Sequence, residues 1–275
     1  MPSLAMLCQN QVDDAITAET LREQLLKDWK ELEPDLLTVS ADNGDDVVAL
    51  DYGEAYIAVM NIPAPIGDDT VELVGPSRLW PETEAFNSDY QAHAVVTVTG
   101  FGEDLTGLDD TFLLSKVVAS LVAISPETFA VYWGSANHLI YPPLFREITM
   151  EALPNPLLLL WVAINVGERP DGVMTGHTVG LDAVGLMDIE IPQTPKTAEE
   201  TVAFLVDVAD YLLTNGLVIK DGDAVKETDE ETIRAVYAVS LLDPEKTVIQ
   251  LQSDMPYSEI VEPPKRGFLA RLFGK

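Results

Sequence analysis

The chain has 275 residues with 46 acidic and 16 basic side chains, which give it a formal net charge of −30. Four of the bases lie in residues 265–275, which hold no acid, so the remaining body has a charge of −34. Such a body repels phosphate backbones and anionic membrane surfaces. The charge therefore excludes nucleic acid and leaves two interpretations: a surface that serves solubility alone, or one that binds a basic partner protein.

Apolar residues make up 47% of the chain, close to the average of folded globular proteins, and Cys8 is the only cysteine. A single cysteine rules out an intramolecular disulfide and a thiolate metal cluster, which fits a reducing compartment. The longest apolar run, residues 157–164, is far shorter than the ~20 residues of a membrane-spanning helix. We expect a cytoplasmic protein with Cys8 as an inert buried thiol.

Hydrophobic periodicity predicts the elements of the first half. Thr17 is a helix N-cap before apolar residues at helical spacing, and Pro81 is placed to begin a short helix. β-rich runs on either side of Asp51-Tyr52-Gly53-Glu54 indicate a hairpin. The expected order is strand 3–8, helix 17–32, strands 47–50 and 55–60, helix 77–86 and strand 92–98. This βαββαβ order is typical of a ferredoxin-like arrangement.

A helix over 109–123 follows, and the same order then returns. Thr197 is the N-cap of a strong helix that ends at Asn215-Gly216. The expected elements are strand 129–133, helix 144–152, strands 157–166 and 179–191, helix 197–213, strand 217–220, and a closing hairpin of 232–242 and 247–251. Only the pattern repeats, since the residues of the two halves show no convincing identity.

The fold class expected from these patterns is α+β, with antiparallel sheet and helices on one face. Residues 1–102 form a first ferredoxin-like half, 103–125 a connecting helix, and 126–262 a second half with the closing hairpin. Residues 263–275 form a basic amphipathic tail. Its apolar Phe268, Leu269, Leu272 and Phe273 fall on one face of a helix, which suits an anionic membrane or a partner's groove. A frayed, disordered C-terminus is the alternative interpretation of the same residues.

Few residues indicate chemistry. His93, His138 and His177 lack metal-ligand spacing to one another, so we expect no metal and no cofactor. Neither a phosphate-binding glycine loop nor a nucleophile elbow is present. The glycine-flanked aromatic and polar residues that we take as ligand-binding candidates are Trp133, His138, His177 and Thr178.

Several segments, in this order, carry a resemblance to a known family. They are Asn61–Ile66, Trp80-Pro81, His93, Tyr132-Trp133-Gly134, Leu160-Trp161, Thr178–Leu181, Gly185 and Asp188–Ile191. The chain resembles the bacterial family of domain of unknown function 4261 over residues 45–225. It differs at Val184, where the family often has an aromatic residue, and after Ile66, where a tryptophan is common. The resemblance implies a single module and no established activity.

Two functions remain open. The first is a non-enzymatic binding protein of immunity or adaptor type, whose acidic face captures a basic protein; it follows from the charge and from the missing catalytic motifs. The second is a small-molecule or metal-dependent enzyme that uses a pocket between the two halves. Membrane contact is expected only through residues 265–275. The sequence does not indicate an oligomeric state.

Overall fold

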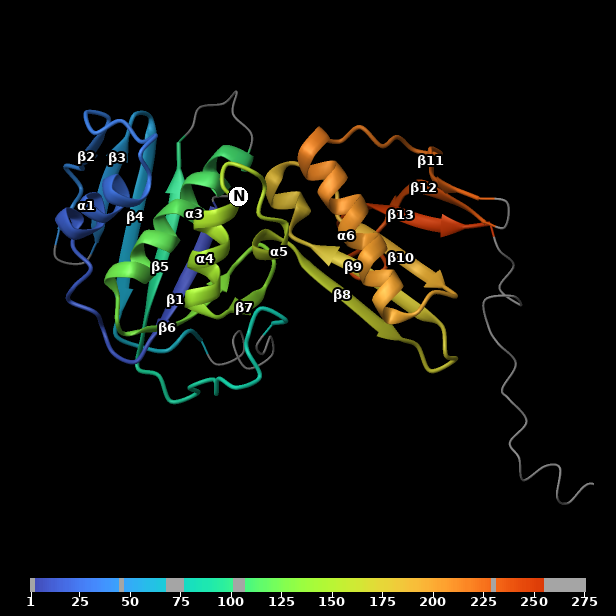
Figure 1. The fold of residues 1–275 in the computed structure, drawn as a ribbon, viewed down its shortest axis with the longest axis horizontal. Coiled ribbons are helices and arrows are strands. Elements are labelled where there is room, and N and C mark those ends of the chain that lie inside the picture. The colour runs from blue at the N-terminus through green and yellow to red at the C-terminus, as the bar shows by residue number, and fades with distance from the viewer. Residues whose placement is uncertain (1–2, 45–46, 68–76, 101–106, 229–230, 255–275) are drawn as a thin grey trace, which may run out of the picture. The chain divides into compact units, whose positions relative to one another are not determined.

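The computed structural model describes residues 3–44, 47–67, 77–100, 107–228 and 231–254. The tail predicted at 263–275 lies outside them. The chain divides into two units (Figure 1). The first comprises Met1–Ala163 and Val179–Leu186, and the second comprises Ile164–Thr178 and Met187–Lys275. This division differs from the expected halves, because the strand predicted at 129–133 belongs to the sheet of the first unit.

The first unit is a seven-stranded sheet with helices on one face. The strands follow the order β2-β3-β4-β5-β1-β6-β7, and every pairing between neighbours is antiparallel. The strands are β1 (Ser3–Gln9), β2 (Leu37–Val39), β3 (Val48–Tyr52), β4 (Ala55–Ile62), β5 (Ala92–Thr99), β6 (Thr128–Trp133) and β7 (His138–Ile140). The helices are α1 (Ala18–Asp28), α3 (Gly107–Ile124), α4 (Pro142–Ala152), α5 (Leu158–Trp161) and the 3-10 turn η1 (Leu181–Val184).

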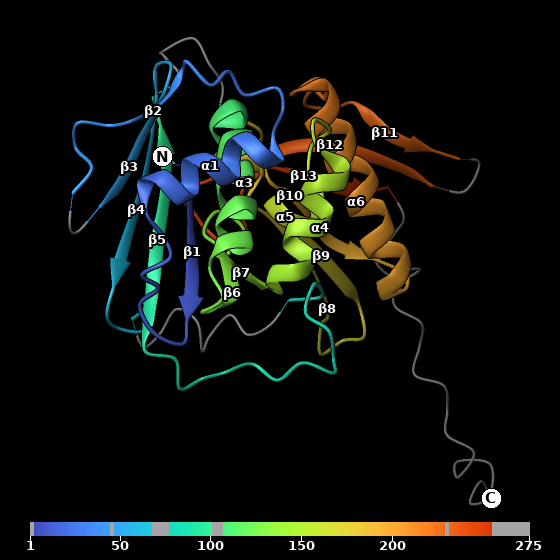
Figure 2. The same cartoon turned by 60° about the vertical axis from the view of Figure 1, so that its left-hand side comes forward.

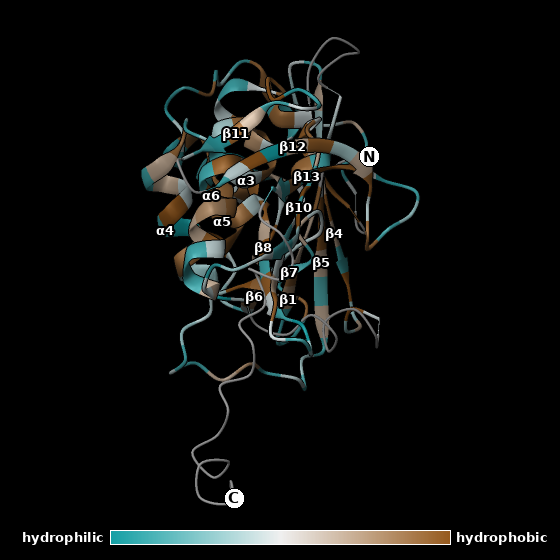
Figure 3. Ribbon diagram, turned by 90° about the vertical axis from the view of Figure 1, so that its right-hand side faces the viewer, coloured by the Kyte–Doolittle hydropathy of each residue, from teal (hydrophilic) through white to brown (hydrophobic). Residues whose placement is uncertain are grey.

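The helical layer of this unit buries the apolar stripe of α3 against the sheet. Leu114, Val117 and Leu121 of α3 are fully buried, as expected for a helix that fills the centre of a core. Figure 2 shows α1 crossing in front of the strands, and Figure 3 shows α3 and α4 on one side of β4 and β5.

The opposite face of the sheet is covered by an irregular segment. Cys8 and Tyr132 point into a second cluster with Ile66 and Tyr90, which Trp80 and Phe86 complete. The helix predicted over 77–86 was wrong, because these residues form turns. Trp80 and Phe86 pack edge to face with centroids 5.6 Å apart, so packing against the sheet outweighs the weak local helix signal around Pro81.

The second unit is a six-stranded sheet in the order β11-β12-β13-β10-β9-β8, with one helix. The pairs β11–β12, β12–β13 and β10–β9 are antiparallel, and β10 and β13 are parallel. The elements are β8 (Ala163–Glu168), β9 (Met174–Val179), β10 (Ile189–Thr194), α6 (Ala198–Asn215), β11 (Ala224–Glu227), β12 (Thr232–Val239) and β13 (Thr247–Ser253). The helix α6 lies over β9, where Gly176 leaves room for Leu205 (Figure 1).

The fold is therefore mixed α+β with antiparallel sheets and few helices, as predicted, while the ferredoxin-like halves are not confirmed. Three further expectations change. The strand predicted at 157–166 begins with the short helix α5, the strand at 179–191 is interrupted by η1, and residues 217–220 form no strand. The caps Thr17 and Thr197 and the closing hairpin are confirmed.

Candidate functional site

Trp133 and His138 lie opposite each other on the neighbouring strands β6 and β7 of the first unit. Both are buried, and Trp133 is only 1% exposed. His138 Nε2 donates to the carbonyl oxygen of Leu160 at 2.9 Å. Burial lowers the pKa of His138, although this hydrogen bond opposes the shift. The imidazole is therefore held neutral as a donor inside the core, where it fixes the chain around Leu160.

His177 and Thr178 lie on β9, mainly in the second unit. The Thr178 hydroxyl donates to Asp188 Oδ1 at 2.9 Å and accepts from the backbone N–H of Ile189 at 2.8 Å. His177 is half-buried and pairs in register with Glu190 of β10. Burial lowers the pKa of His177, and the charge of Glu190 acts in the opposite direction. The four candidates thus fall two by two on the two units.

Glu190 is a buried carboxylate that holds a turn in place. It accepts hydrogen bonds from the Ser240 hydroxyl, from the backbone N–H of Leu241 at 3.1 Å and from Gln250 Nε2 at 3.3 Å. Both carboxylate oxygens are therefore engaged. Glu190 therefore holds the turn between β12 and β13 against β10.

The remaining titratable candidates also have structural roles. His93 Nδ1 donates to the carbonyl oxygen of Ala64 at 2.7 Å. Cys8 is buried, and its burial raises the pKa of the thiol to about 12, which leaves it protonated and unreactive. Across the described ranges, no group of three His, Cys, Asp or Glu side chains is arranged to hold a metal ion. None of the helices described here combines the length and apolar character that a membrane crossing requires.

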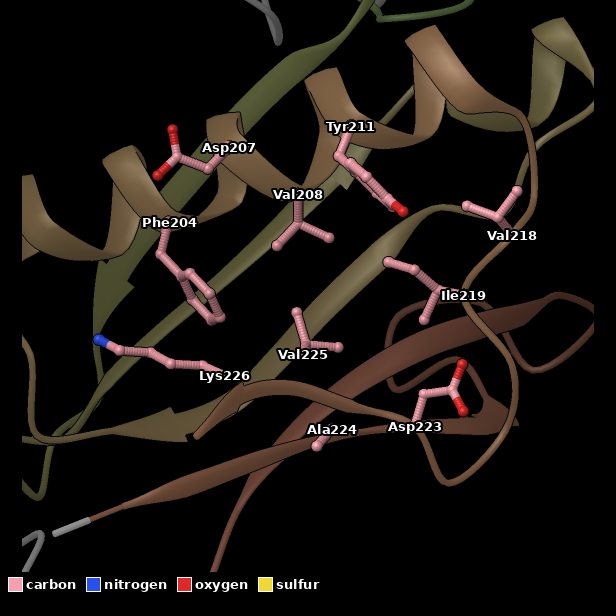
Figure 4. Close-up of a pocket in the computed structure, with 10 residues that line it drawn as sticks. All are labelled: Phe204, Asp207, Val208, Tyr211, Val218, Ile219, Asp223, Ala224, Val225 and Lys226. Carbon is pink, nitrogen blue, oxygen red and sulfur yellow. The ribbon is translucent and has the colours of Figure 1, made fainter. Parts of the chain in front are cut away.

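A groove that the sequence did not indicate lies on the second unit, between α6 and the segment that follows it (Figure 4). Its volume is about 570 Å³, within the range of about 300–1,000 Å³ typical of ligand pockets. The apolar lining side chains come from both walls: Phe204, Val208 and Tyr211 from α6, and Val218, Ile219 and Val225 from the facing segment. The remaining lining residues are Asp207, Asp223, Ala224 and Lys226.

Local structure fixes both walls of this groove. The helix α6 begins with a capping box between Thr197 and Glu200 and ends at Gly216, whose φ of 77° suits glycine. The chain after Gly216 is tied to β12, because the Tyr237 hydroxyl donates to the carbonyl oxygen of Ile219 at 2.5 Å and Gly222 N–H donates to that of Ala235 at 2.8 Å. The wall that faces α6 is therefore fixed to β12 by hydrogen bonds.

The groove exposes apolar surface in an acidic neighbourhood. Tyr211 is 50% exposed and Val218 is 43% exposed. Residues 198–227 carry seven acidic side chains and two lysines, and α6 itself has four acids and no base. At one end, the Nζ atoms of Lys196 and Lys226 lie 5.9 and 6.0 Å from the ring centroid of Phe204. Outside the end that holds these two lysines, the acidic surroundings favour a ligand whose apolar side chains are flanked by positive charges.

One feature of the sequence, not used above, is consistent with this groove. Leu205, Val208, Ala209 and Leu212 form the buried stripe of α6, and Phe204, Val208 and Tyr211 form a second stripe beside it. A helix that is apolar over so wide an arc needs cover on more than one side. Periodicity alone does not reveal that the second cover is incomplete.

The geometry defines an acidic, mixed α+β protein with an open apolar groove on its second unit. Residues 177–252 match the model of a family described as Domain of unknown function (DUF4261). This confirms the resemblance within that range, which contains every residue that lines the groove. The stretch 45–176 of the sequence-based resemblance lies outside the match. No curated protein and no solved structure matches the chain.

Proposed function

We propose that the protein is a non-enzymatic binding module of immunity or adaptor type. Its groove takes a segment of a basic partner protein that presents apolar side chains flanked by Lys or Arg. The observation that carries the proposal is the coincidence of the two features: exposed Tyr211 and Val218 line the groove, and the helix that forms one wall has four acids and no base. The lone Cys8 supports a cytoplasmic location.

Each feature of the groove has a different role in binding. Apolar anchors such as Tyr211 supply affinity when a partner covers them. The surrounding acids speed association and select cationic segments, an effect that weakens as salt rises. An amphipathic helix laid into a groove uses both kinds of contact. The body charge of −34 disfavours competing phosphate-rich ligands.

The test uses two labelled peptides of the same composition. One is a short Leu–Lys helix with all leucines on one face, and the other is its scrambled form. We expect fluorescence anisotropy to show micromolar binding of the amphipathic peptide that weakens with added salt. Binding that ignores the order of the residues would mean diffuse charge attraction and would contradict the proposal.

Variants then place the site. Val218→Asp puts a charge into the exposed apolar wall and should weaken binding at least about tenfold, which corresponds to about 1.4 kcal/mol. Thr247→Asp adds the same charge at an exposed position of β13 that does not line the groove, and it should bind as the wild type does. Equal loss in both variants would place the binding elsewhere.

The enzyme alternative draws on Trp133, His138, His177 and Thr178. Three of these side chains are buried. His138 is hydrogen-bonded to the Leu160 carbonyl, and the Thr178 hydroxyl is hydrogen-bonded to Asp188 and to the backbone of Ile189. The groove is the feature that supports the proposal of a binding module.

A further inference from the structure

We infer that the groove between α6 and β11 is occupied by the chain's own C-terminal segment, residues 265–275. This inference rests on the proposed function, because it assumes that the groove takes a basic apolar segment. If the tail fills the groove, an external partner must displace the tail before it can bind.

The sequence of the segment is complementary to the groove. Residues 265–275 contain four bases and no acid, whereas residues 198–227 contain seven acids and two bases. Four large apolar side chains of the segment share one helical face, Phe268, Leu269, Leu272 and Phe273. The groove offers an apolar lining beside acidic Asp207 and Asp223, with Lys226 as its one basic lining residue. Both the apolar and the electrostatic contacts therefore match.

The described chain also ends close to the groove. The backbone N–H of Asp254 donates to the carbonyl oxygen of Thr232, and Ser253 pairs with Ile233. Ile233 in turn pairs with Lys226, a lining residue. Because neighbouring strands are ~4.8 Å apart, Ser253 lies two strands, or about 10 Å, from the backbone of Lys226. Residues 255–264 span up to about 33 Å when extended, so the tail reaches the groove.

Covalent attachment makes even weak docking significant. A short flexible linker gives an effective concentration on the order of 1 mM. With an intrinsic dissociation constant of about 100 µM, the tail would fill about nine-tenths of the grooves and weaken an external peptide about tenfold. A membrane or a second copy of the chain are the other possible recipients of this tail, and the experiments below separate them.

The first experiment measures competition in the full chain. A labelled peptide with the sequence of residues 265–275 is titrated into the wild type and into the full-length double variant Leu272→Ser with Phe273→Ser, which keeps all four charges of the tail. We expect the peptide to bind the variant about tenfold more tightly, because the altered tail no longer fills the groove. Adding Val218→Asp to the double variant should abolish this binding.

The outcomes separate the inference from the proposed function. Equal affinity of the peptide for the wild type and the tail variant would overturn the inference. If the Leu–Lys helix nevertheless binds, the groove functions for external partners and the proposed function stands. If neither peptide binds the tail variant, both fall.

The second experiment traps the docked tail. Full-length Ala224→Cys with Ala270→Cys is treated with a short bismaleimide, to which the buried Cys8 thiol does not respond. The expected product is an intramolecular cross-link in the monomer. The control pair is Thr247→Cys with Ala270→Cys, because Thr247 is exposed on β13 and does not line the groove. It should cross-link at least tenfold less. A cross-linked dimer would assign the tail to a second copy. If both pairs cross-link equally in solution and both lose the cross-link when anionic vesicles are added, the tail binds a membrane and not the groove.

Discussion

The two units of this protein cover their sheets to different degrees. In the first unit, helices pack on one face and the aromatic cluster around Tyr90 packs on part of the other, where Met60 of β4 remains 45% exposed. In the second unit, α6 leaves an apolar groove whose Tyr211 and Val218 remain about half exposed. Under the proposed function, the first unit is mainly a scaffold and the second unit provides the surface for binding.

Charged pairs differ in burial within each unit. Asp28 is almost fully buried and receives both terminal nitrogens of Arg146 at 2.7 and 2.9 Å. Ser120 donates to the same carboxylate and accepts from Trp29 Nε1, so the pair links α1, α3 and α4. In the second unit, Lys196 and Glu231 form a largely enclosed pair at 2.8 Å, whereas the pair of Arg169 and Asp171, also at 2.8 Å, has side chains that are 44% and 32% exposed. Exposed pairs contribute about 0–1 kcal/mol.

The largest expected effect comes from breaking the buried pair. Arg146→Ala leaves Asp28 buried without its partner, which should cost about 3 kcal/mol of unfolding free energy. All four tryptophans, at 29, 80, 133 and 161, lie in the first unit. Denaturant titration followed by tryptophan emission therefore reports on that unit.

The same variant also changes the acid response. Burial alone would raise the pKa of Asp28, but hydrogen bonds from Arg146 and Gln24 outweigh it, and the pKa lies below its ordinary value of 3.8. The stability that results is present above the ordinary value and is lost as pH falls through the lowered pKa. Arg169→Ala is the matched control; its unfolding is followed by far-ultraviolet circular dichroism because the second unit has no tryptophan, and its stability should change by less than about 1 kcal/mol. Similar losses in both variants would contradict the distinction between the buried pair and the exposed pair.

A smaller effect tests why η1 sits on the first unit. Gly180 has a φ of 121°, and a side-chain carbon there would strike the carbonyl oxygen of Trp161. Gly180→Ala should therefore cost about 2 kcal/mol or more, again by tryptophan emission. Gly185→Ala is the control, because Gly185 also has a positive φ, 79°, but its Cβ would meet nothing within 4 Å. It should cost only about 1 kcal/mol, from backbone strain alone. Equal costs would show that the close approach to Trp161 is unimportant.

These positions also show how far local sequence reasoning reaches. Thr17 and Thr197 correctly predict the starts of α1 and α6, because an N-cap depends only on residues within one helical turn. The turn after Ser240 is equally local. The helix predicted over 77–86 was wrong because the conformation of this segment depends on Trp80 and Phe86, which pack on a sheet built from distant strands. No local pattern contains that contact.

The candidate site required still more distant information. The groove depends on α6 facing a segment that is held by β12, through the bond from Tyr237 to Ile219. The sequence predicted a strand at 217–220, which would have hidden Val218 in a sheet rather than exposing it at a groove. Trp133, His138, His177 and Thr178 were selected for glycine-flanked polarity, which occurs equally where buried polar groups support the backbone. The net charge of −30, in contrast, follows directly from the sequence.

The smallest expected effect compares the two histidines with lowered pKa values. Burial lowers the pKa of His138 in the first unit and of His177 in the second, below the ordinary value of 6.5. The folded state then binds these protons less readily than the unfolded state does, so stability falls as pH drops below about 6.5. Above that value, both states hold neutral imidazoles and the histidines contribute no pH dependence.

His138→Gln and His177→Gln separate the two units in this respect. Glutamine keeps an N–H donor for the Leu160 carbonyl but does not titrate. We expect His138→Gln to flatten the change in tryptophan-reported stability between about pH 7.5 and about pH 5.5, a window above the ordinary carboxylate pKa values. His177→Gln should leave that change as in the wild type, because its ring lies in the second unit, which has no tryptophan. If both variants flatten the profile equally, the two units unfold as one cooperative body, and the scaffold is then stabilised by the unit that carries the groove.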